Sequence, residues 1–170
     1  MGNLVPIRHS IRLRGFDYSS NNLYFVTVCT KYKENIFVGA DYHPPASIQL
    51  NEIGNMAKQY WEEIPNHYPH VSLDEFVIMP NHIHGIITIG HNTRADDNPP
   101  LHVVTGTIGA IVRGYKIGVT KWCRQNTNIY DVWQRNYYEH IIRDEVDLNR
   151  IRKYIHNNPS NWTKDKLFPL

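Results

Sequence analysis

The chain has 170 residues, of which 41% are hydrophobic and 20% charged, enough for one domain with a hydrophobic core. The formal net charge is +2, and no apolar run has the length of a membrane span, which excludes an integral membrane protein of the helical class. Because the N-terminal segment also has no apolar stretch typical of a secretory signal, we expect a cytoplasmic protein with a single domain over residues 1–170.

The charges are distributed unevenly along the chain. Residues 1–33 carry five Lys or Arg and one acid, residues 34–75 carry one Lys and seven acids, and residues 105–130 carry four Lys or Arg and no acid. Two basic segments around an acidic one indicate a one-sided positive surface, which attracts phosphate backbones. The alternative is that these charges are solvated surface groups without a partner.

The first predicted elements are a strand and a helix. Residues 23–31, LYFVTVCTK, are rich in β-branched and aromatic side chains and predict a buried strand. Asn51 suits the N-cap of a helix whose apolar period runs to Ile64. We expect Pro65 to close that helix.

The middle of the chain predicts two short strands and a second helix. The strands are residues 75–80 and 82–90, and a polar loop follows at residues 91–100. From about Thr107 to Gln125 the apolar residues keep a helical period, although two glycines weaken it.

The C-terminal part predicts a fourth strand and a third helix. Residues 131–143, DVWQRNYYEHIIR, favour the strand, and Asp144 suits the N-cap of a helix that Pro159 ends. The order β-α-β-β-α-β is that of the ferredoxin-like split βαβ sandwich, an α+β fold. It implies an antiparallel sheet with two helices on one face, and we expect the other face to be free.

Two histidines mark the strand at residues 82–90. His82 and His84 project from the same side of an extended chain, while Ile83, Ile87 and Ile89 point to the other. Two adjacent neutral imidazoles on a rigid strand can bind one divalent ion. Histidines on the surface, or satisfied by neighbouring groups, are the alternative in a chain with ten of them.

The last predicted helix carries a second candidate group. Tyr154 and Asn158 are four residues apart and share a helix face. A tyrosine hydroxyl is a competent nucleophile when its ionisation is favoured, which a metal ion achieves best, and Asn158 can supply a neutral oxygen ligand. The alternative is a tyrosine packed on the sheet and an asparagine that caps the helix.

These motifs resemble those of the IS200/IS605-type single-tyrosine transposases, and most closely the REP-associated tyrosine transposases. The matching segments are IRLRGFDYS (11–19), FVTVCT (25–30), MPNHIHGII (79–87) and VWQRNYYEHIIRDEVDLNRIRKYIHNNPSNW (132–162), which together span nearly the whole chain. The combination of MPNHIHG, YYxHIIRD and YIxxNP at these distances is far more specific than any one of its parts.

The resemblance implies an HUH endonuclease with a divalent ion, Mg²⁺ or Mn²⁺. It places the ion on His82 and His84, with Asn158 as third ligand and Tyr154 as nucleophile on a helix over residues 144–158. The family's insertion-sequence members usually have glutamine where this chain has Asn158, and asparagine fits the REP-associated branch better. Asn81 is expected to orient the histidines.

The resemblance also implies the reaction and the partner. Tyr154 attacks a phosphate of single-stranded DNA beside a hairpin repeat, a 5′-phosphotyrosine forms and a 3′-hydroxyl leaves, and a second 3′-hydroxyl can reverse the step. We expect a protein of the bacterial nucleoid that acts as a monomer or as a homodimer with exchanged tyrosine helices.

Basic residues with neighbouring aromatic rings are the candidates for DNA contact. An N-terminal arm over residues 1–20 provides several, and others lie on the second helix and the fourth strand. The set is Arg8, Arg12, Arg14, Tyr18, Lys116, Lys121, Trp133 and Arg135.

Three other functions fit parts of the pattern. A module that binds DNA or RNA hairpins without cutting them fits the charges and aromatics equally well, but it has no use for Tyr154 beside a metal site. A structural zinc protein is weakly supported, because no closing Cys or His pair is visible. A metal-dependent nuclease with a water nucleophile would form no covalent intermediate.

Overall fold

The centre of the molecule is a four-stranded antiparallel sheet with the strand order β2-β3-β1-β4. The computed structural model describes residues 22–42, 48–90 and 106–168. Its strands are β1 (Asn22–Cys29), β2 (Val71–Met79), β3 (His82–Ile89) and β4 (Tyr138–Ile142). Its helices are α1 (Glu52–Glu62), α2 (Ile64–His67), α3 (Ile108–Asn126) and α4 (Glu145–Asn157), with short 3₁₀ helices η1 (Lys31–Lys33) and η3 (Pro159–Lys164). This order and pairing confirm the predicted ferredoxin-like α+β fold.

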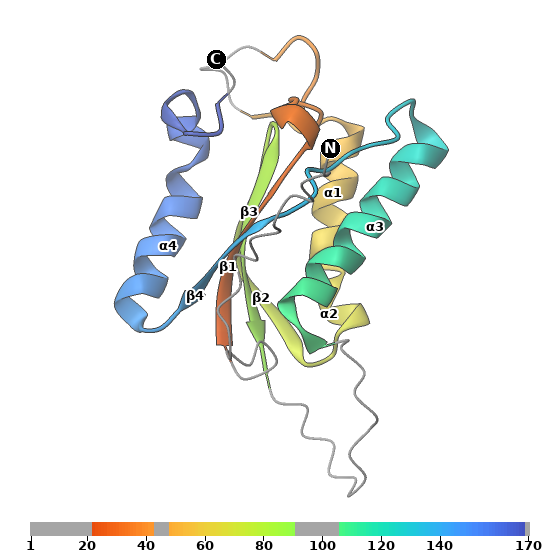
Figure 1. The fold of residues 1–170 in the computed structure, drawn as a ribbon. Coiled ribbons are helices and arrows are strands. Elements are labelled where there is room, and N and C mark those ends of the chain that lie inside the picture. Colours follow the sequence, from red (N-terminus) through yellow and green to blue (C-terminus); the bar gives the residue numbers. More distant parts are fainter. Residues whose placement is uncertain (1–21, 43–47, 91–105, 169–170) are drawn as a thin grey trace, which may run out of the picture.

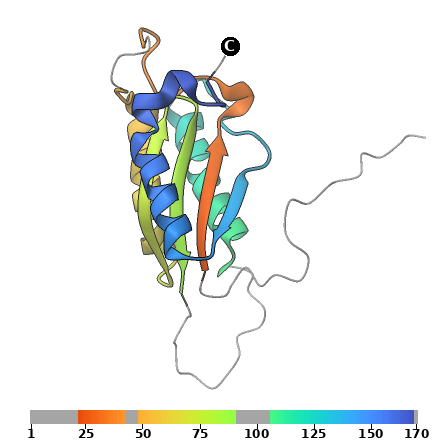
Figure 2. The same cartoon turned by 90° about the vertical axis from the view of Figure 1, so that its left-hand side faces the viewer.

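The sheet buries apolar side chains on both faces. On one face Tyr24, Val26 and Val28 of β1 pack beneath α1 and α3, because alternate residues of a strand point to the same side. Figures 1 and 2 show α1 and α3 together on that face and α4 alone on the other. The larger hydrophobic core therefore lies between the sheet and the α1–α3 layer.

The opposite face of the sheet is covered by α4, so the prediction that it would be free is wrong. Leu148, Ile151 and Ile155 form an apolar stripe at helical spacing on α4, and they pack on Phe25 and Ile86. Such a stripe has to be buried against another element. The histidine face is consequently the floor of an interface between sheet and helix.

Three helices have side-chain N-caps, and two of these caps, Asn51 and Asp144, are predicted from the sequence. The side chains of Asn51, Thr107 and Asp144 accept hydrogen bonds from the backbone N–H three residues on, at the starts of α1, α3 and α4. Pro65 does not close a helix, because α1 has already ended and Pro65 lies in the first turn of α2. A proline is tolerated there, since the first N–H groups of a helix have no intrahelical acceptor.

The edge strands differ most from prediction. Strand β2 begins at Val71, earlier than expected, and contains a bulge between Leu73 and Phe76. Strand β4 begins only at Tyr138, since the preceding residues form one isolated bridge, from Trp133 to Thr30 just after the end of β1. Between that bridge and the Tyr138–Thr27 pair, one chain advances five residues and the other three, so segment 134–137 bulges out of the ladder.

Two predicted features lie outside the described residues: the basic arm over residues 1–20, with Arg8, Arg12, Arg14 and Tyr18, and the polar loop at 91–100. Among the helices that the structure describes, none combines the length and the apolar character that crossing a membrane demands.

Candidate active site

The two predicted metal ligands lie side by side beneath α4. His82 and His84 project from β3 toward that helix, with ring centroids 4.4 Å apart, and only 0% and 2% of their surfaces are exposed. Ile83 and Ile87, which alternate with them, belong to the core on the other face. The alternation of side chains along β3 thus places the histidines on one face of the sheet and the isoleucines on the other.

The tautomer of His82 is set by Asn81. Nδ1 of His82 lies 2.7 Å from Oδ1 of Asn81, and an amide oxygen only accepts, so Nδ1 carries the proton. The Asn81 amide group donates in turn to the carbonyls of Lys33 and Leu167, at 3.0 and 2.9 Å, which fixes its orientation. The Nε2 lone pair of His82 is therefore available, and this buried atom has no hydrogen-bond partner among the described residues.

His84 is held from the neighbouring strand. Its Nδ1 lies 2.8 Å from Oγ1 of Thr27, the residue that faces it across the β1–β3 ladder. Phe25 stacks on its ring at a centroid distance of 5.3 Å. Because the threonine hydroxyl can accept the Nδ1 proton, Nε2 of His84 can also serve as a ligand.

Tyr154 reaches the histidines from α4. Its hydroxyl lies 3.1 Å from Nε2 of His84 and its ring meets Phe25 edge-on, while 44% of the residue remains exposed. One side of Tyr154 therefore contacts His84, and the other side is open to solvent, as a large substrate would require.

Asn158 is the C-cap of α4 and keeps helical backbone angles although a proline follows it. It is 2% exposed, and its Oδ1 is a second buried atom with no hydrogen-bond partner within the described segments. Its Nδ2 donates to Oδ2 of Asp165 at 2.9 Å. Proline at 159 begins η3, which returns the chain toward the histidines.

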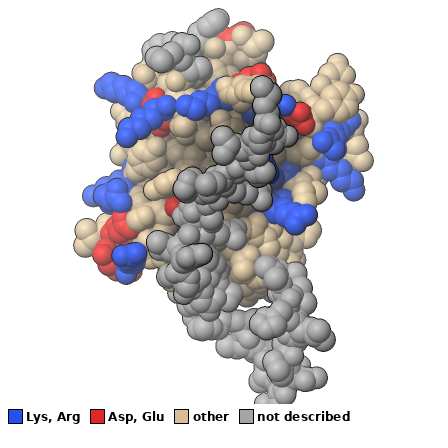
Figure 3. Space-filling view, in the orientation of Figure 1, with Lys and Arg blue, Asp and Glu red and all other residues tan. Residues whose placement is uncertain are grey.

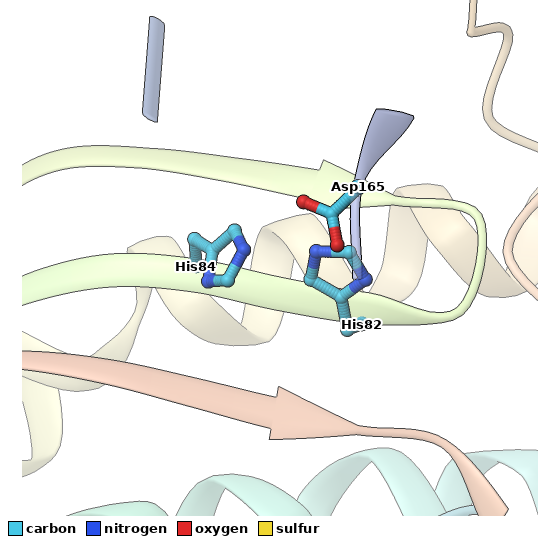
Figure 4. A group of neighbouring side chains, drawn as sticks. All are labelled: His82, His84 and Asp165. Atoms are coloured by element: carbon cyan, nitrogen blue, oxygen red, sulfur yellow. The ribbon is translucent and has the colours of Figure 1, made fainter. Parts of the chain in front are cut away.

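Asp165, just after η3, completes the cluster and was not predicted from the sequence. Its Oδ2 accepts a hydrogen bond from the Tyr154 hydroxyl at 3.2 Å. One ligand atom each from His82, His84 and Asp165 all lie within 4.8 Å of one another, and Figure 4 shows the carboxylate above His82, with one of its oxygens on the side of His84. Nothing in the sequence spacing marks it, because a 3₁₀ turn brings it there.

These donors fit a divalent metal ion. Two imidazole nitrogens, an amide oxygen and a carboxylate are ligands of the type that Mn²⁺ and Mg²⁺ accept. The buried, unpartnered Nε2 of His82 and Oδ1 of Asn158 support the fit, because buried polar atoms are ordinarily satisfied.

The electrostatics keep the cluster uncharged apart from Asp165. Burial, reinforced by the neighbouring His84, lowers the pKa of His82 to about 2. Burial lowers the pKa of His84 to about 4, against a smaller rise from Asp165. Burial, together with the charge and hydrogen bond of Asp165, raises the pKa of Tyr154 to about 12. Both imidazoles are thus neutral near pH 7, which is the form that can bind a metal ion, and the tyrosine is protonated.

The strand position of the histidines also depends on the far face of the sheet. Gly85 follows His84, and an added Cβ at Gly85 would lie 2.4 Å from Cζ2 of Trp61 in α1. The indole therefore packs directly against the β3 backbone. Only glycine, which has no side chain, leaves room for it at position 85.

A groove leads from solvent to this cluster. This α4 groove, of about 1010 Å³, runs between α4 and the β1–β4 half of the sheet, and its lining includes Phe25, His84, Tyr138, Arg150, Tyr154 and Lys166. Tyr138 is 56% exposed and presents an aromatic ring beside the tyrosine. Cations and aromatic rings together suit a polynucleotide strand.

The predicted DNA-contacting residues within the described segments lie elsewhere. Lys116, Lys121, Trp133 and Arg135 line a separate groove along α3. Lys121 and Arg135 are exposed, whereas Nζ of Lys116 donates to the carbonyl of Gln134 and the Trp133 indole donates to the carbonyl of Lys116. The last two therefore hold segment 134–137 against α3.

Comparison with known proteins gives two related sequences and several solved structures of similar fold. A Haemophilus influenzae protein of uncharacterised function is 49% identical over 170 residues, covering 95% of this chain and 93% of its own length. A second H. influenzae protein, described as a candidate REP-associated tyrosine transposase, is 30% identical over 149 residues, covering 84% of this chain and 73% of its own. A REP-associated tyrosine transposase bound to a REP hairpin shares the fold, with a TM-score of 0.63, 19% identity and coverage of 93% of this chain and 77% of that one. No family model matches the chain.

Proposed function

Because this chain belongs to the REP-associated tyrosine transposases, we propose that it is a metal-dependent single-strand DNA endonuclease and strand transferase acting beside hairpin repeats. The observation that carries the proposal is the 3.1 Å contact between the Tyr154 hydroxyl and Nε2 of His84, next to two buried ligand atoms without partners. Most buried polar atoms have a hydrogen-bond partner, so two unpartnered ligand-type atoms in one cluster favour a bound ion.

In this proposal His82, His84 and Asn158 hold a divalent ion, Mg²⁺ or Mn²⁺, with Asp165 as a further oxygen donor. Asn81 fixes the imidazole of His82 from behind. The ion supplies Lewis acidity, which polarises the scissile phosphate and favours ionised tyrosine. That help is needed, since a Tyr154 pKa of about 12 leaves the hydroxyl neutral at pH 7.

The proposed chemical step forms one bond and breaks one. The Tyr154 oxygen attacks the phosphorus, a 5′-phosphotyrosine forms, and the bond to the 3′-oxygen breaks. Asp165 accepts the hydrogen bond of the hydroxyl and is placed to take its proton, which the leaving 3′-oxygen needs. Attack by another 3′-hydroxyl on the phosphotyrosine reverses the step and joins strands without ATP.

The substrate proposed is single-stranded DNA next to a hairpin, as in the REP hairpin complex of the structural neighbour. The α4 groove provides the path to Tyr154. Since α4 packs on the sheet of its own chain, the packing supports a monomer with Tyr154 acting in cis. A helix-exchanged homodimer is the alternative. The setting proposed is the bacterial nucleoid, with residues 1–170 acting as one domain.

The test is covalent capture of DNA. Labelled hairpin oligonucleotides, taken from repeats near the gene of this protein, are incubated with Mn²⁺ or Mg²⁺ and separated on a denaturing gel. We expect a labelled band at the mass of the protein with wild type and with Tyr32→Phe, which changes an exposed tyrosine away from both grooves. Tyr154→Phe and His82→Ala should give no such band.

The other outcomes identify the alternatives. A shift on a native gel without covalent product would favour the hairpin-binding module. Cleavage that persists in Tyr154→Phe would point to a water nucleophile and exclude the phosphotyrosine route.

A further inference from the structure

Tyr154 lies between two hollows of the surface. One is the α4 groove, which is lined by the sheet as well as by α4. The other, the α4–η3 pocket, has a volume of about 250 Å³, and its lining comes only from residues 150–165, which form the C-terminal half of α4 and the turn after it. Arg150, Tyr154, Lys164 and Asp165 line both hollows. The steps proposed above use the tyrosine and the acid but assign nothing to this pocket.

The walls of the α4–η3 pocket are polar and held in place. Lys153 and Asn157 lie four residues apart and share a face of α4, whereas the apolar stripe of the helix packs on the sheet. Two hydrogen bonds of 2.9 Å tie the following turn to this face. Nδ2 of Asn161 donates to the carbonyl of Asn157, and Nδ2 of Asn158 donates to Oδ2 of Asp165. The pocket is therefore preformed before any substrate binds.

The charges of the α4–η3 pocket favour an anion. Lys153 and Lys164 are exposed, and within the described part of the chain neither forms an ion pair. The acid of the lining, Asp165, already accepts hydrogen bonds from Tyr154 and Asn158. Figure 3 shows several Lys and Arg side chains close together at the upper left, over the end of α4 that leads into η3 in Figure 1. Free ammonium groups on a rigid wall suit a phosphate.

The direction of the proposed attack decides which part of the DNA can reach the pocket. In an in-line displacement the leaving oxygen departs on the side of phosphorus opposite the attacking oxygen. Because the attacking oxygen belongs to Tyr154, the strand with the 3′-hydroxyl departs away from α4. The strand that stays joined to Tyr154 remains beside α4, and its first nucleotide is the part nearest the pocket.

The size of the pocket agrees with one nucleotide. Its volume of about 250 Å³ lies at the small end of ligand sites, which begin at roughly 300 Å³. The α4 groove, at about 1010 Å³, has room for a longer segment. The two hollows are therefore suited to unequal lengths of DNA on the two sides of the scissile phosphate.

We propose that the α4–η3 pocket holds the first nucleotide 3′ of the scissile phosphate, with Lys153 and Lys164 on the phosphate that follows it. The inference rests on the proposed function, because it takes single-stranded DNA as substrate and Tyr154 as nucleophile. It adds a site that positions the scissile phosphate before attack. The same site keeps the phosphotyrosine strand in place while a second 3′-hydroxyl enters through the α4 groove.

The first test removes the charge from one side of the contact at a time. Hairpin oligonucleotides carry one neutral methylphosphonate at each phosphate of the single-stranded segment in turn, and fluorescence anisotropy measures Kd. The proteins are Tyr154→Phe, which forms no covalent bond, and the same chain with Lys153→Gln/Lys164→Gln or, as control on α1, Lys58→Gln.

One methylphosphonate should weaken binding to the Tyr154→Phe protein and to the Lys58→Gln control by about tenfold, but binding to the lysine double variant by less than about twofold. That phosphate should be the one after the first nucleotide 3′ of the cleavage site mapped with wild type. With unmodified DNA, the salt dependence of log Kd should fall by roughly 0.7 in the lysine double variant, the value for one lost single-strand phosphate contact.

Three binding results would overturn the inference. DNA affinity that is unchanged by Lys153→Gln/Lys164→Gln would leave the pocket without a nucleotide. Equal sensitivity to every methylphosphonate with and without the two lysines would mean that they contact no particular phosphate. A coupled phosphate on the 5′ side of the cleavage site would assign the pocket to the leaving strand.

The second test uses the reaction itself. An oligonucleotide that ends at the 3′-hydroxyl of the first nucleotide after the cleavage site lacks the phosphate in question. Wild type and Lys153→Gln/Lys164→Gln should form the adduct with it at equal rates, whereas the lysine double variant should be about tenfold slower on the longer strand. Equal slowing on both strands would contradict a contact to that phosphate. If no adduct ever forms, the proposed reaction fails, but the binding measurements still decide whether the pocket holds DNA.

Discussion

The hydroxyl of Tyr154 donates a hydrogen bond to Oδ2 of Asp165 across 3.2 Å, although eleven residues and a 3₁₀ helix separate them in the chain. The same carboxylate oxygen accepts from Asn158. Asp165 therefore contacts both Tyr154, the nucleophile candidate, and Asn158, a ligand candidate. Its charge and hydrogen bond contribute to the raised pKa of Tyr154.

Asp165→Asn should lower the pKa of Tyr154 from about 12 toward the ordinary value of 10, because a negative charge that opposes ionisation is removed. Burial remains, so the pKa should stay above 10. The measurement is the pH titration of tyrosine by NMR with ring-labelled tyrosine, in which Tyr154→Phe identifies the signal among eleven tyrosines. An unchanged Tyr154 titration would contradict the electrostatic role of Asp165.

Asn81→Ala should weaken Mn²⁺ binding by about 10- to 100-fold, the usual effect of removing a group that orients a metal-binding histidine. Isothermal calorimetry measures the affinity, with Asn55→Ala on the exposed surface of α1 as control. Asn81→Asp keeps an oxygen for Nδ1 of His82 and should retain more affinity than alanine. Equal affinity in Asn81→Ala and wild type would show that His82 is oriented by other means.

The metal-free protein should lose stability as the pH falls below about 6.5. The pKa values of His84 and His82 are about 4 and about 2 when folded, both below the value of 6.5 for a solvated histidine, so the unfolded chain binds more protons in this range. Between pH 6.5 and 4 His84 alone should cost about 3 kcal/mol of unfolding free energy.

Urea unfolding with a chelator at several pH values tests this expectation. The carboxyls of Asp74 and Asp147, whose pKa values are lowered by their hydrogen-bond partners Arg152 and His140, also lose stabilisation in acid. The decisive quantity is therefore the difference between wild type and His84→Gln, with exposed His67→Gln as control. A His84→Gln curve parallel to that of wild type would mean that the imidazole is solvated.

Gly85→Ala should destabilise the fold by about 1 to 3 kcal/mol, because the new Cβ overlaps the indole of Trp61 and the sheet must shift. Urea unfolding measures the loss. Gly106→Ala is the control, since its nearest contact would be the end of the His70 side chain at 3.3 Å. The shift should also reduce Mn²⁺ affinity through His84, and a Gly85→Ala protein with full stability and affinity would refute the close packing.

The sequence predicts the histidine strand better than the elements around it. The two-residue period of β3 is a local pattern, and it predicts the strand and which of its side chains share a face. The apolar periods of α1 and α3 are local as well, and they predict the two helices. The bulge at 134–137 breaks a strand whose composition stays strand-like, and only its pairing with β1 shows the interruption. Asp165 is invisible for a related reason, because its position depends on where η3 directs the chain.

The two hydrophobic cores are unequal, and this has a consequence for slow motions. Helix α4 is held by a small set of side chains and the Asp74–Arg152 ion pair, whereas α1 and α3 share the larger core. We therefore expect the amide protons of α4 to exchange with solvent earlier than those of α3, as one cooperative unit. Each such opening would uncover both imidazoles, which are almost completely buried in the closed state, and would widen the route by which an ion from solution reaches them.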